Sequence, residues 1–301
     1  MVTSFFTALL LMSFFTTSIY SFFHDNKNLI QILILTLVSL LIINASWYYS
    51  LLSVPLLLVP IIFIKDIPYS QLVSFCMCGS ILLAYFMLNF FLNYTISYML
   101  LIAVFSVVFM CILAINGLFE DNLKKYLIYS NAIQLMFVLL DLTVAKLSGK
   151  ISILGTIQIF NYTFAGLLFF LSIGVLSKNN RRKNISRLQA SYYRNKFNSI
   201  FAIIAAISLA GVPGLNIFVS EWLLFKASFL ISPVITIFGI FIALLLFIMY
   251  FKIVYVLMVG ESKVKEMTPK LLSGVNGLLA LTCVVFGLLP GIQFLILNKV
   301  L

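Results

Sequence analysis

Long apolar stretches follow one another along nearly the whole chain, and short polar joints separate them. A helix that crosses a bilayer needs about 20 mostly apolar residues, because each residue advances the helix by about 1.5 Å. The pattern predicts about ten such helices, at residues 4–23, 29–45, 48–64, 71–92, 97–118, 122–145, 151–176, 197–230, 233–258 and 271–297. We therefore predict an all-α, polytopic transmembrane helix bundle that forms one domain over residues 1–301.

Residues 29–64 admit two interpretations. The segment Asn44-Ala-Ser-Trp47 either forms a hairpin between two short helices or lies within one long, tilted helix. With a single helix at this place, every later helix would take the opposite orientation relative to the N-terminus.

Composition supports a membrane location and excludes an aqueous fold. Hydrophobic residues make up 63% of the chain and charged residues 9%, whereas soluble domains have roughly 45–50% and about 25%. The first six residues, Met-Val-Thr-Ser-Phe-Phe, lack the basic region of a secretory signal, so we interpret the first apolar stretch as a retained helix.

The basic residues lie mainly in alternate joints. Fourteen of the 19 Lys and Arg residues lie in or beside the joints after the first, third, fifth, seventh and ninth predicted helices, namely Lys27, Lys65, Lys124, Lys125, the seven from Lys178 to Lys196, Lys263, Lys265 and Lys270. Lys146, Lys150 and Lys299 lie on the opposite side. This asymmetry follows the positive-inside rule and supports an even number of helices. The net charge of +11 is therefore an orientation signal, and we expect no nucleic acid partner.

The basic loop from Lys178 to Lys196 also predicts a lipid contact. Clusters of Lys and Arg beside a membrane attract anionic headgroups. We expect phospholipids to bind there, with cardiolipin as the candidate.

Cysteine and histidine usage indicates no metal or cofactor site on this chain. Cys76, Cys78, Cys111 and Cys283 fall within apolar stretches, and the single histidine, His24, falls in a joint. These residues form no ligand set for zinc, haem or an iron-sulfur cluster. No glycine-rich phosphate loop or dinucleotide fingerprint is present either.

Glu221 is the most informative ionisable residue within an apolar stretch. It follows Gly211, Pro213 and Gly214, which should interrupt the helix because proline lacks a backbone donor and glycine tolerates unusual torsions. Unwound backbone at membrane depth persists only where protein buries it or where it lines a watered cavity. The break therefore predicts a polar channel beside Glu221, and a carboxylate that merely joins two helices is the structural alternative.

Other charged residues also enter or border the predicted helices. Lys226 and Lys252 are candidate partners of Glu221. Glu120 and Asp121 precede Lys124 and Lys125 by four residues, a spacing that favours ion pairs at the start of a helix. Asp141 and Lys146 lie near the other end of that helix, where a long lysine reaches water, so an interfacial role is favoured for both.

Two classes of function fit a broken helix with acidic and basic groups. One is a proton-handling subunit of an energy-coupling complex, and the other is a secondary transporter of a small solute or ion. A transporter built from inverted repeats would carry a second broken helix in a matching position, and the sequence predicts no second one.

Two motifs resemble a known family. The segment Asn122-Leu-Lys-Lys-Tyr-Leu-Ile-Tyr-Ser-Asn-Ala-Ile-Gln-Leu-Met136 is similar to the signature Asp-Leu-Lys-Arg-Leu-Leu-Ala-Tyr-Ser-Ser-Ile-Ser-His-Leu-Gly of the antiporter-like subunits of respiratory complex I. Gln134 stands where that signature has His. Ser208-Leu-Ala-Gly-Val-Pro213, followed by Phe218 and Glu221, resembles the family's later broken helix, Ser-Leu-Ala-Gly-Ile-Pro with Phe-x-x-Lys or Phe-x-x-Glu.

The resemblance extends over residues 105–295, and residues 1–104 diverge from it. Tyr162, Phe164 and the segment Tyr250-Phe-Lys-Ile-Val-Tyr255 are most similar to mitochondrial subunit 2, with fewer N-terminal helices, whereas a Glu at position 221 is similar to subunit 4. The resemblance implies a subunit of the proton-translocating NADH:ubiquinone oxidoreductase in the mitochondrial inner membrane, with its basic loops facing the matrix. It implies that NADH, FMN, iron-sulfur clusters and ubiquinone bind elsewhere in that complex, and that other membrane-arm subunits are the partners.

The resemblance also implies a proton path. Glu221 would be its outer station, Lys124 its matrix-side contributor, and Lys252, Asp141 and Lys146 auxiliary groups. A scaffold subunit that pumps no protons, or a secondary transporter, is the alternative.

Overall fold

The structure, a computed structural model, describes residues 2–94, 98–149, 151–177, 183–262 and 264–300, without the side chains of 151–153 and 300. Within these ranges the chain is helical, as predicted. The α-helices are α1 (Val2–His24), α2 (Leu29–Ala45), α3 (Ser53–Ile62), α4 (Tyr69–Asn93), α5 (Met99–Phe119), α6 (Leu123–Leu147), α7 (Ile151–Leu176), α8 (Ser191–Arg194), α9 (Lys196–Leu209), α10 (Asn216–Ile231), α11 (Pro233–Met258), α12 (Lys270–Leu288) and α13 (Pro290–Val300). Three short 3-10 helices, η1 (Asn26–Asn28), η2 (Trp47–Leu52) and η3 (Ile185–Leu188), lie in the joints or precede α3.

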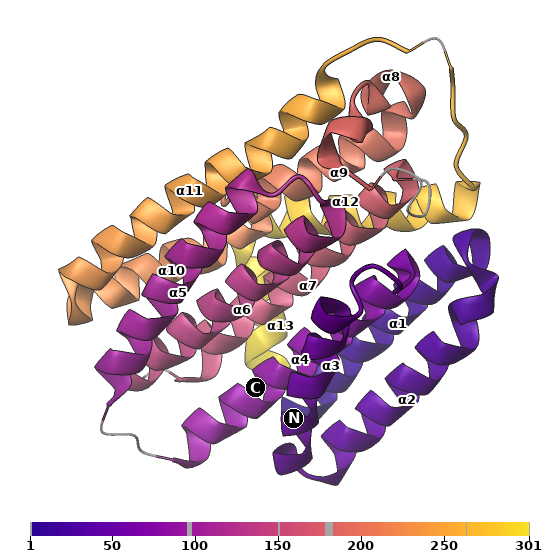
Figure 1. Cartoon of the computed structure of the whole chain (residues 1–301). Coiled ribbons are helices and arrows are strands. Elements are labelled where there is room, and N and C mark those ends of the chain that lie inside the picture. The colour runs from indigo at the N-terminus through magenta and orange to yellow at the C-terminus, as the bar shows by residue number, and fades with distance from the viewer. Residues whose placement is uncertain (1, 95–97, 150, 178–182, 263, 301) are drawn as a thin grey trace.

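The long helices run nearly alongside one another as a bundle (Figure 1). Among the described residues, eight helical stretches are long and apolar enough to cross a membrane, and Trp47–Ile62 and Lys196–Leu209 are shorter apolar stretches. Every predicted stretch therefore has a helical counterpart, which confirms the polytopic fold.

Residues 29–64 form the hairpin and not the single tilted helix. Ser46 has extended torsions (φ −161°, ψ 145°) and separates α2 from η2, which packs back against α2. Gln71 Nε2, at the start of α4, donates a hydrogen bond to Asn28 Oδ1 at 3.1 Å. The chain has thus returned to the end of the bundle at which α2 begins, so α3 runs antiparallel to α2.

The basic joints meet at one end of the bundle, here called the basic end. The joint between α5 and α6 pairs with the joint after α7, because Leu123 N donates to Lys183 O at 2.9 Å and Ile185 N donates to Asp121 O at 2.8 Å. Ala190 N donates to Val259 O at 2.8 Å, which connects this joint to the one after α11. These contacts support the charge asymmetry for the described residues; residues 178–182 of the predicted lipid-binding loop and Lys263 lie outside them.

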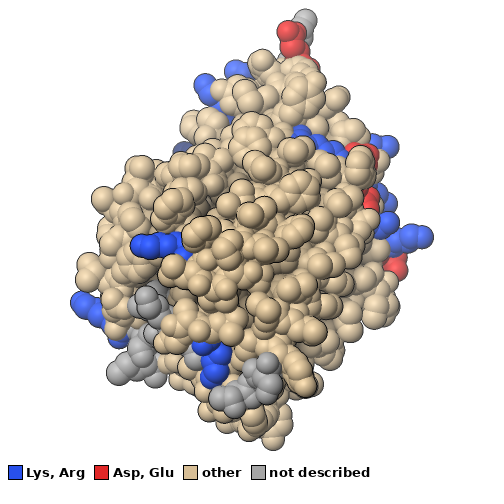
Figure 2. All heavy atoms as spheres, turned by 90° about the vertical axis from the view of Figure 1, so that its left-hand side faces the viewer, with Lys and Arg blue, Asp and Glu red and all other residues tan. Residues whose placement is uncertain are grey.

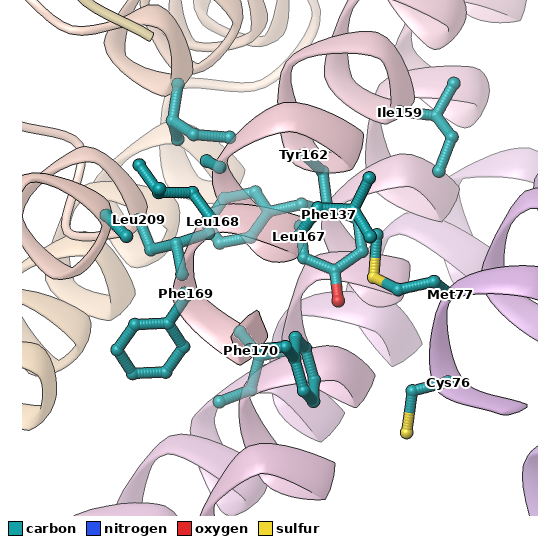
Figure 3. Close-up of a cluster of buried hydrophobic side chains, with 14 of the residues drawn as sticks. Cys76, Met77, Phe137, Ile159, Tyr162, Leu167, Leu168, Phe169, Phe170 and Leu209 are labelled. Atoms are coloured by element: carbon teal, nitrogen blue, oxygen red, sulfur yellow. The ribbon is translucent and has the colours of Figure 1, made fainter. Parts of the chain in front are cut away.

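The core centres on α7, whose side chains are nearly all buried. Its residues Tyr162, Leu167, Leu168, Phe169 and Phe170 pack among side chains from neighbouring helices, including Met77, Phe137 and Leu209 (Figure 3). By contrast, α5 and α11 expose large apolar side chains along their outer faces. The surface in Figure 2 is accordingly uncharged over most of its area, as a surface facing lipid requires.

A second helix is broken, in a stretch predicted to be continuous. The last predicted stretch divides into α12 and α13 at Leu289, before Pro290. Gln293 Nε2 donates to Phe286 O at 2.6 Å. This side chain replaces a backbone donor of the interrupted helix, so the break leaves that carbonyl satisfied.

Candidate functional site

The predicted break between α9 and α10 is present at Ala210–Leu215. Gly211 (φ +70°) and Gly214 (φ +92°) take left-handed torsions on either side of Pro213. Such torsions cost other L-residues about 1–2 kcal/mol, because Cβ crowds the neighbouring carbonyl. The sequence therefore interrupts the helix locally, with two glycines that adopt the turn and one proline that cannot continue the ladder.

Glu221 lies directly against this break. A Cβ added to Gly211 would stand 2.2 Å from Glu221 Oε2, which means that the carboxyl group occupies the space left by the absent side chain. Glu221 is 4% exposed, and its Oε1 has no hydrogen-bond partner. The break and the carboxyl group thus lie directly against each other.

Neither lysine expected to pair with Glu221 lies within 4.0 Å of its carboxyl group. Lys226 is exposed on the outer side of α10, and Lys252 Nζ donates to Leu118 O at 3.0 Å and to Glu120 O at 2.8 Å. Lys252 therefore satisfies carbonyls at the C-terminal end of α5, where a cation is favourable. Lys125 and Glu120 form an ion pair at 3.9 Å. The two pairs predicted from the four-residue spacing, Glu120 with Lys124 and Asp121 with Lys125, do not come within 4.0 Å.

Asp141 faces the interior, in contrast to the interfacial role favoured from the sequence. It is 0% exposed, and neither carboxyl oxygen has a hydrogen-bond partner. Helix α6 packs against α10, and Asp141 interacts electrostatically with Glu221. The structure thus buries two carboxyl groups on neighbouring helices, and neither lies within 4.0 Å of a cationic side chain among the described residues.

Lys146 and Lys124 bind main-chain carbonyls at opposite ends of α6. Lys146 Nζ donates to Phe91 O at 2.7 Å, near the end of α4. Lys124 Nζ donates to Ile64 O at 3.1 Å and to Ile67 O at 2.7 Å, in the joint between α3 and α4. Lys124 is 9% exposed and belongs to the basic end of the bundle.

Four buried polar residues follow one face of α6. Lys124, Asn131, Gln134 and Asp141 are separated by seven, three and seven residues, so they lie within an arc of about 100° on an α-helix. Asp141 lies 17 residues after Lys124, a separation of about 26 Å along the helix, which is close to the roughly 30 Å hydrocarbon core of a bilayer. We call these residues the α6 polar face.

Uncharged side chains from neighbouring helices complete the α6 polar face. Gln158 Nε2 of α7 donates to Gln134 Oε1 at 2.9 Å, and Tyr162 and Ser80 both donate to Asn131 Oδ1. Gln134 Nε2 and Gln158 Oε1 are buried without partners in the described part of the chain. A buried donor and acceptor of this kind are the groups that internal water binds.

A second polar cluster joins the two helix breaks. Ser208 Oγ donates to Asn216 Oδ1 at 2.6 Å, and Asn216 Nδ2 donates to Asn161 O at 2.9 Å. Asn161 Nδ2 then donates to Gln293 Oε1 at 3.1 Å. None of these residues was predicted from the sequence, because none of them is ionisable. The signal in the sequence was the repeated placement of carboxamides in apolar stretches.

No cluster of three or more His, Cys, Asp or Glu side chains that could hold a metal ion occurs in the part of the chain that the structure describes. The buried chemistry of the site therefore consists of two carboxyl groups, a lysine and a set of amides and hydroxyls. Such groups can bind, orient and transfer protons or water.

Part of the chain is similar in sequence to subunits of NADH-quinone oxidoreductases. The chain is 25% identical over 131 residues to NADH-quinone oxidoreductase subunit N of Hirschia baltica, covering 44% of this chain and 27% of that one. It is 27% identical over 134 residues to NADH-quinone oxidoreductase subunit M of Buchnera aphidicola, covering 44% of this chain and 26% of that one. The matched region thus spans about a quarter of the length of these curated relatives.

Solved structures share the fold. A chain of the archaeal membrane-bound sulfane sulfur reductase has a TM-score of 0.67 at 17% identity, over 78% of this chain and 49% of that one. A chain of respiratory complex I from Thermus thermophilus has a TM-score of 0.64 at 12% identity, over 95% of this chain and 66% of that one. A chain of the Mrp complex from Dietzia has a TM-score of 0.66 at 13% identity, over 98% of this chain and 65% of that one.

The family described as NADH:quinone oxidoreductase/Mrp antiporter, transmembrane, matches residues 3–249. That match covers α1 to most of α11, including the α6 polar face, the first helix break and Glu221. The chain therefore belongs to the family of transmembrane subunits of NADH:quinone oxidoreductases and Mrp antiporters.

Proposed function

We propose that this chain is a membrane-arm subunit of a proton-translocating NADH:quinone oxidoreductase and that it conducts protons along the α6 polar face. The observation that carries the proposal is the buried row of Lys124, Asn131, Gln134 and Asp141, which extends for about the thickness of a bilayer core. Each buried polar group costs free energy unless it is satisfied, so a row of this length favours a functional role.

In this proposal, Lys124 exchanges protons at the basic end. Asn131 and Gln134 do not titrate, so they orient water molecules that carry the proton past the middle of the helix. Asp141 and Glu221 receive the proton in the farther half of the bundle. Lys146 and Lys252 are auxiliary groups whose bonds to carbonyls hold helix ends in place.

The finer identity also belongs to the proposal. Tyr162, Phe164 and Tyr250–Tyr255 support mitochondrial subunit 2, and the bacterial relatives are compatible with either a bacterial or a mitochondrial membrane. In the mitochondrial case the basic end faces the matrix. Residues 1–104 would be the divergent part of the domain, other membrane-arm subunits the partners, and NADH, FMN, iron-sulfur clusters and ubiquinone would be bound elsewhere in the complex.

The experiment replaces Glu221 by Gln in the assembled complex. We expect fewer protons pumped per electron, or slower coupled turnover, with normal assembly on a native gel. Glu261→Gln is the matched control, because Glu261 is exposed in the joint after α11. An assembled Glu221→Gln complex that pumps as the control does would contradict the proposal, and a defect in assembly alone would favour the scaffold.

Transport of a small ion or solute is the second candidate. It gains support from the second broken helix, because paired broken helices surround the binding sites of many transporters. The two breaks are in contact, since a Cβ on Gly287 of α12 would lie 2.2 Å from Gly214 O. Uptake of an ion by the chain in vesicles, without quinone reduction, would favour this candidate over the first.

A further inference from the structure

The basic end contains a pocket beside the start of the proposed proton path, and Lys124 belongs to both. Its volume is about 460 Å³, and it lies between the end of α3, the start of α6 and the joint after α7. Lys65, Lys124, Lys125 and Lys183 line it, together with Asp66 and Ile64. Residues far apart in the sequence therefore place four lysines and one aspartate around a single pocket.

The positive charge in this pocket is mostly unneutralised by the protein. Lys125 pairs with Glu120 at 3.9 Å, but its side chain is 51% exposed, so this pair is weak. Lys65 and Lys183 are exposed and have no carboxylate within 4.0 Å among the described residues. Lys124 interacts electrostatically with both Lys183 and Asp66. Holding like charges together costs free energy that a bound anion offsets.

Lys124 also has bonding capacity left for a ligand. An ammonium group has three donors, and Lys124 uses two of them on Ile64 O and Ile67 O. These bonds fix the ammonium group at the wall of the pocket. A phosphate oxygen can then accept the third donor without reordering the side chain, which lowers the entropic cost of binding.

The position of the pocket indicates where its ligand comes from. It opens at the basic end, among the joints, and the neighbouring residues Ile61, Ile62 and Phe63 expose 51%, 68% and 55% of their surface. An apolar surface of this kind beside a basic pocket suits a molecule with a phosphate group and an acyl chain. A free anion would use the lysines but would gain nothing from the isoleucines.

We propose that the Lys65–Lys124–Lys125–Lys183 pocket binds a phosphate group, supplied by an anionic phospholipid whose acyl chain lies along the end of α3. The pocket shares Lys124 with the proposed proton path, whereas Lys65, Lys125 and Lys183 belong to the pocket alone. The proposal differs from the lipid contact expected for the loop from Lys178 to Lys196, because it requires lysines from three joints and includes only Lys183 of that loop.

The test uses the assembled complex in detergent, with Lys65→Gln/Lys183→Gln as the variant. Both residues lie outside the proton path. The control, Lys27→Gln/Lys265→Gln, removes the same charge from exposed positions at the basic end but outside the pocket. After partial delipidation, titration with phosphatidylglycerol should show roughly thirtyfold weaker binding for the variant, or about fivefold per lysine, with no comparable change in the control.

Three further arms complete the test. The unmodified complex should gain thermal stability from phosphatidylglycerol but not from phosphatidylcholine. This measurement does not depend on the folding of the variant. If inorganic phosphate alone stabilises the unmodified complex against heat, and the variant loses this effect, the pocket is an anion site whose ligand is free phosphate. Equal phosphatidylglycerol binding by unmodified complex, variant and control, together with no effect of inorganic phosphate, would overturn the proposal.

Discussion

The carboxyl group of Glu221 fills the space beside Gly211 in which any other residue would place its Cβ. The distance from that Cβ position to Oε2 is 2.2 Å, and real Cβ contacts are essentially never closer than 3.0 Å. Gly211 also has φ +70°. The residue is thus constrained twice, by its torsions and by the carboxyl group it accommodates, which couples the shape of the break to the position of Glu221.

Gly211→Ala should therefore disturb both the break and the carboxyl group. We expect a loss of about 2–4 kcal/mol, from left-handed strain and from displacement of Glu221. Gly214→Ala should cost about 1–2 kcal/mol, because its φ is +92° but its nearest neighbour is 3.8 Å away. Gly274→Ala, in open space within α12, should be neutral or slightly stabilising. Thermal denaturation of complexes that carry each of the three variants measures the order of these losses. Equal losses for the three variants would contradict the constraint on Gly211.

Gly287→Ala tests the contact between the two breaks. Its added Cβ would lie 2.2 Å from Gly214 O and 2.3 Å from Leu215 Cα, and backbone cannot move aside as a side chain can. We expect impaired assembly, although Gly287 itself lies within a regular helix. Normal assembly of Gly287→Ala with normal thermal stability would show that the breaks do not need to touch.

Asp141 and Glu221 should act as a coupled pair. Their carboxyl groups interact across α6 and α10, so a change in one alters the environment of the other. We predict that Asp141→Asn and Glu221→Gln have non-additive effects on the rate of coupled turnover, with a coupling of about 1 kcal/mol or more. Additive effects of the two single substitutions in the double variant would mean that the carboxyl groups function separately.

Lys252 should affect stability more than proton transfer. Its ammonium group satisfies Leu118 O and Glu120 O, so Lys252→Met should leave these carbonyls without a donor and cost about 1–3 kcal/mol. Lys226→Met is the matched control, because Lys226 is exposed on the neighbouring helix α10. A drop in protons per electron for Lys252→Met, without a lower melting temperature, would instead place Lys252 in the proton path.

The sequence predicts the helices well because length and apolarity alone decide which stretches cross a membrane. It also predicts the break before Glu221, since two glycines and a proline act locally. It cannot tell which way Asp141 faces, because α6 is apolar on several sides and one carboxylate near a helix end fits either lipid headgroups or the interior. The break at Leu289 has a local signal of the same kind in Pro290 and Gly291, and attention to charged residues alone passes over it. The contact of Gln293 with Asn161 could not be predicted, because it depends on packing between distant helices.

Conduction of protons along the α6 polar face is tested by the proton-to-electron ratio of the Gln134→Leu/Gln158→Leu variant in the assembled complex. Replacing both partners of one hydrogen bond avoids a buried unsatisfied group, so stability should change little. Asn116→Leu is the control, because it removes an exposed amide from α5. We predict a lower ratio, or slower coupled turnover, for the double variant only. A double variant with normal assembly and the same ratio and coupled turnover as the control would contradict the account.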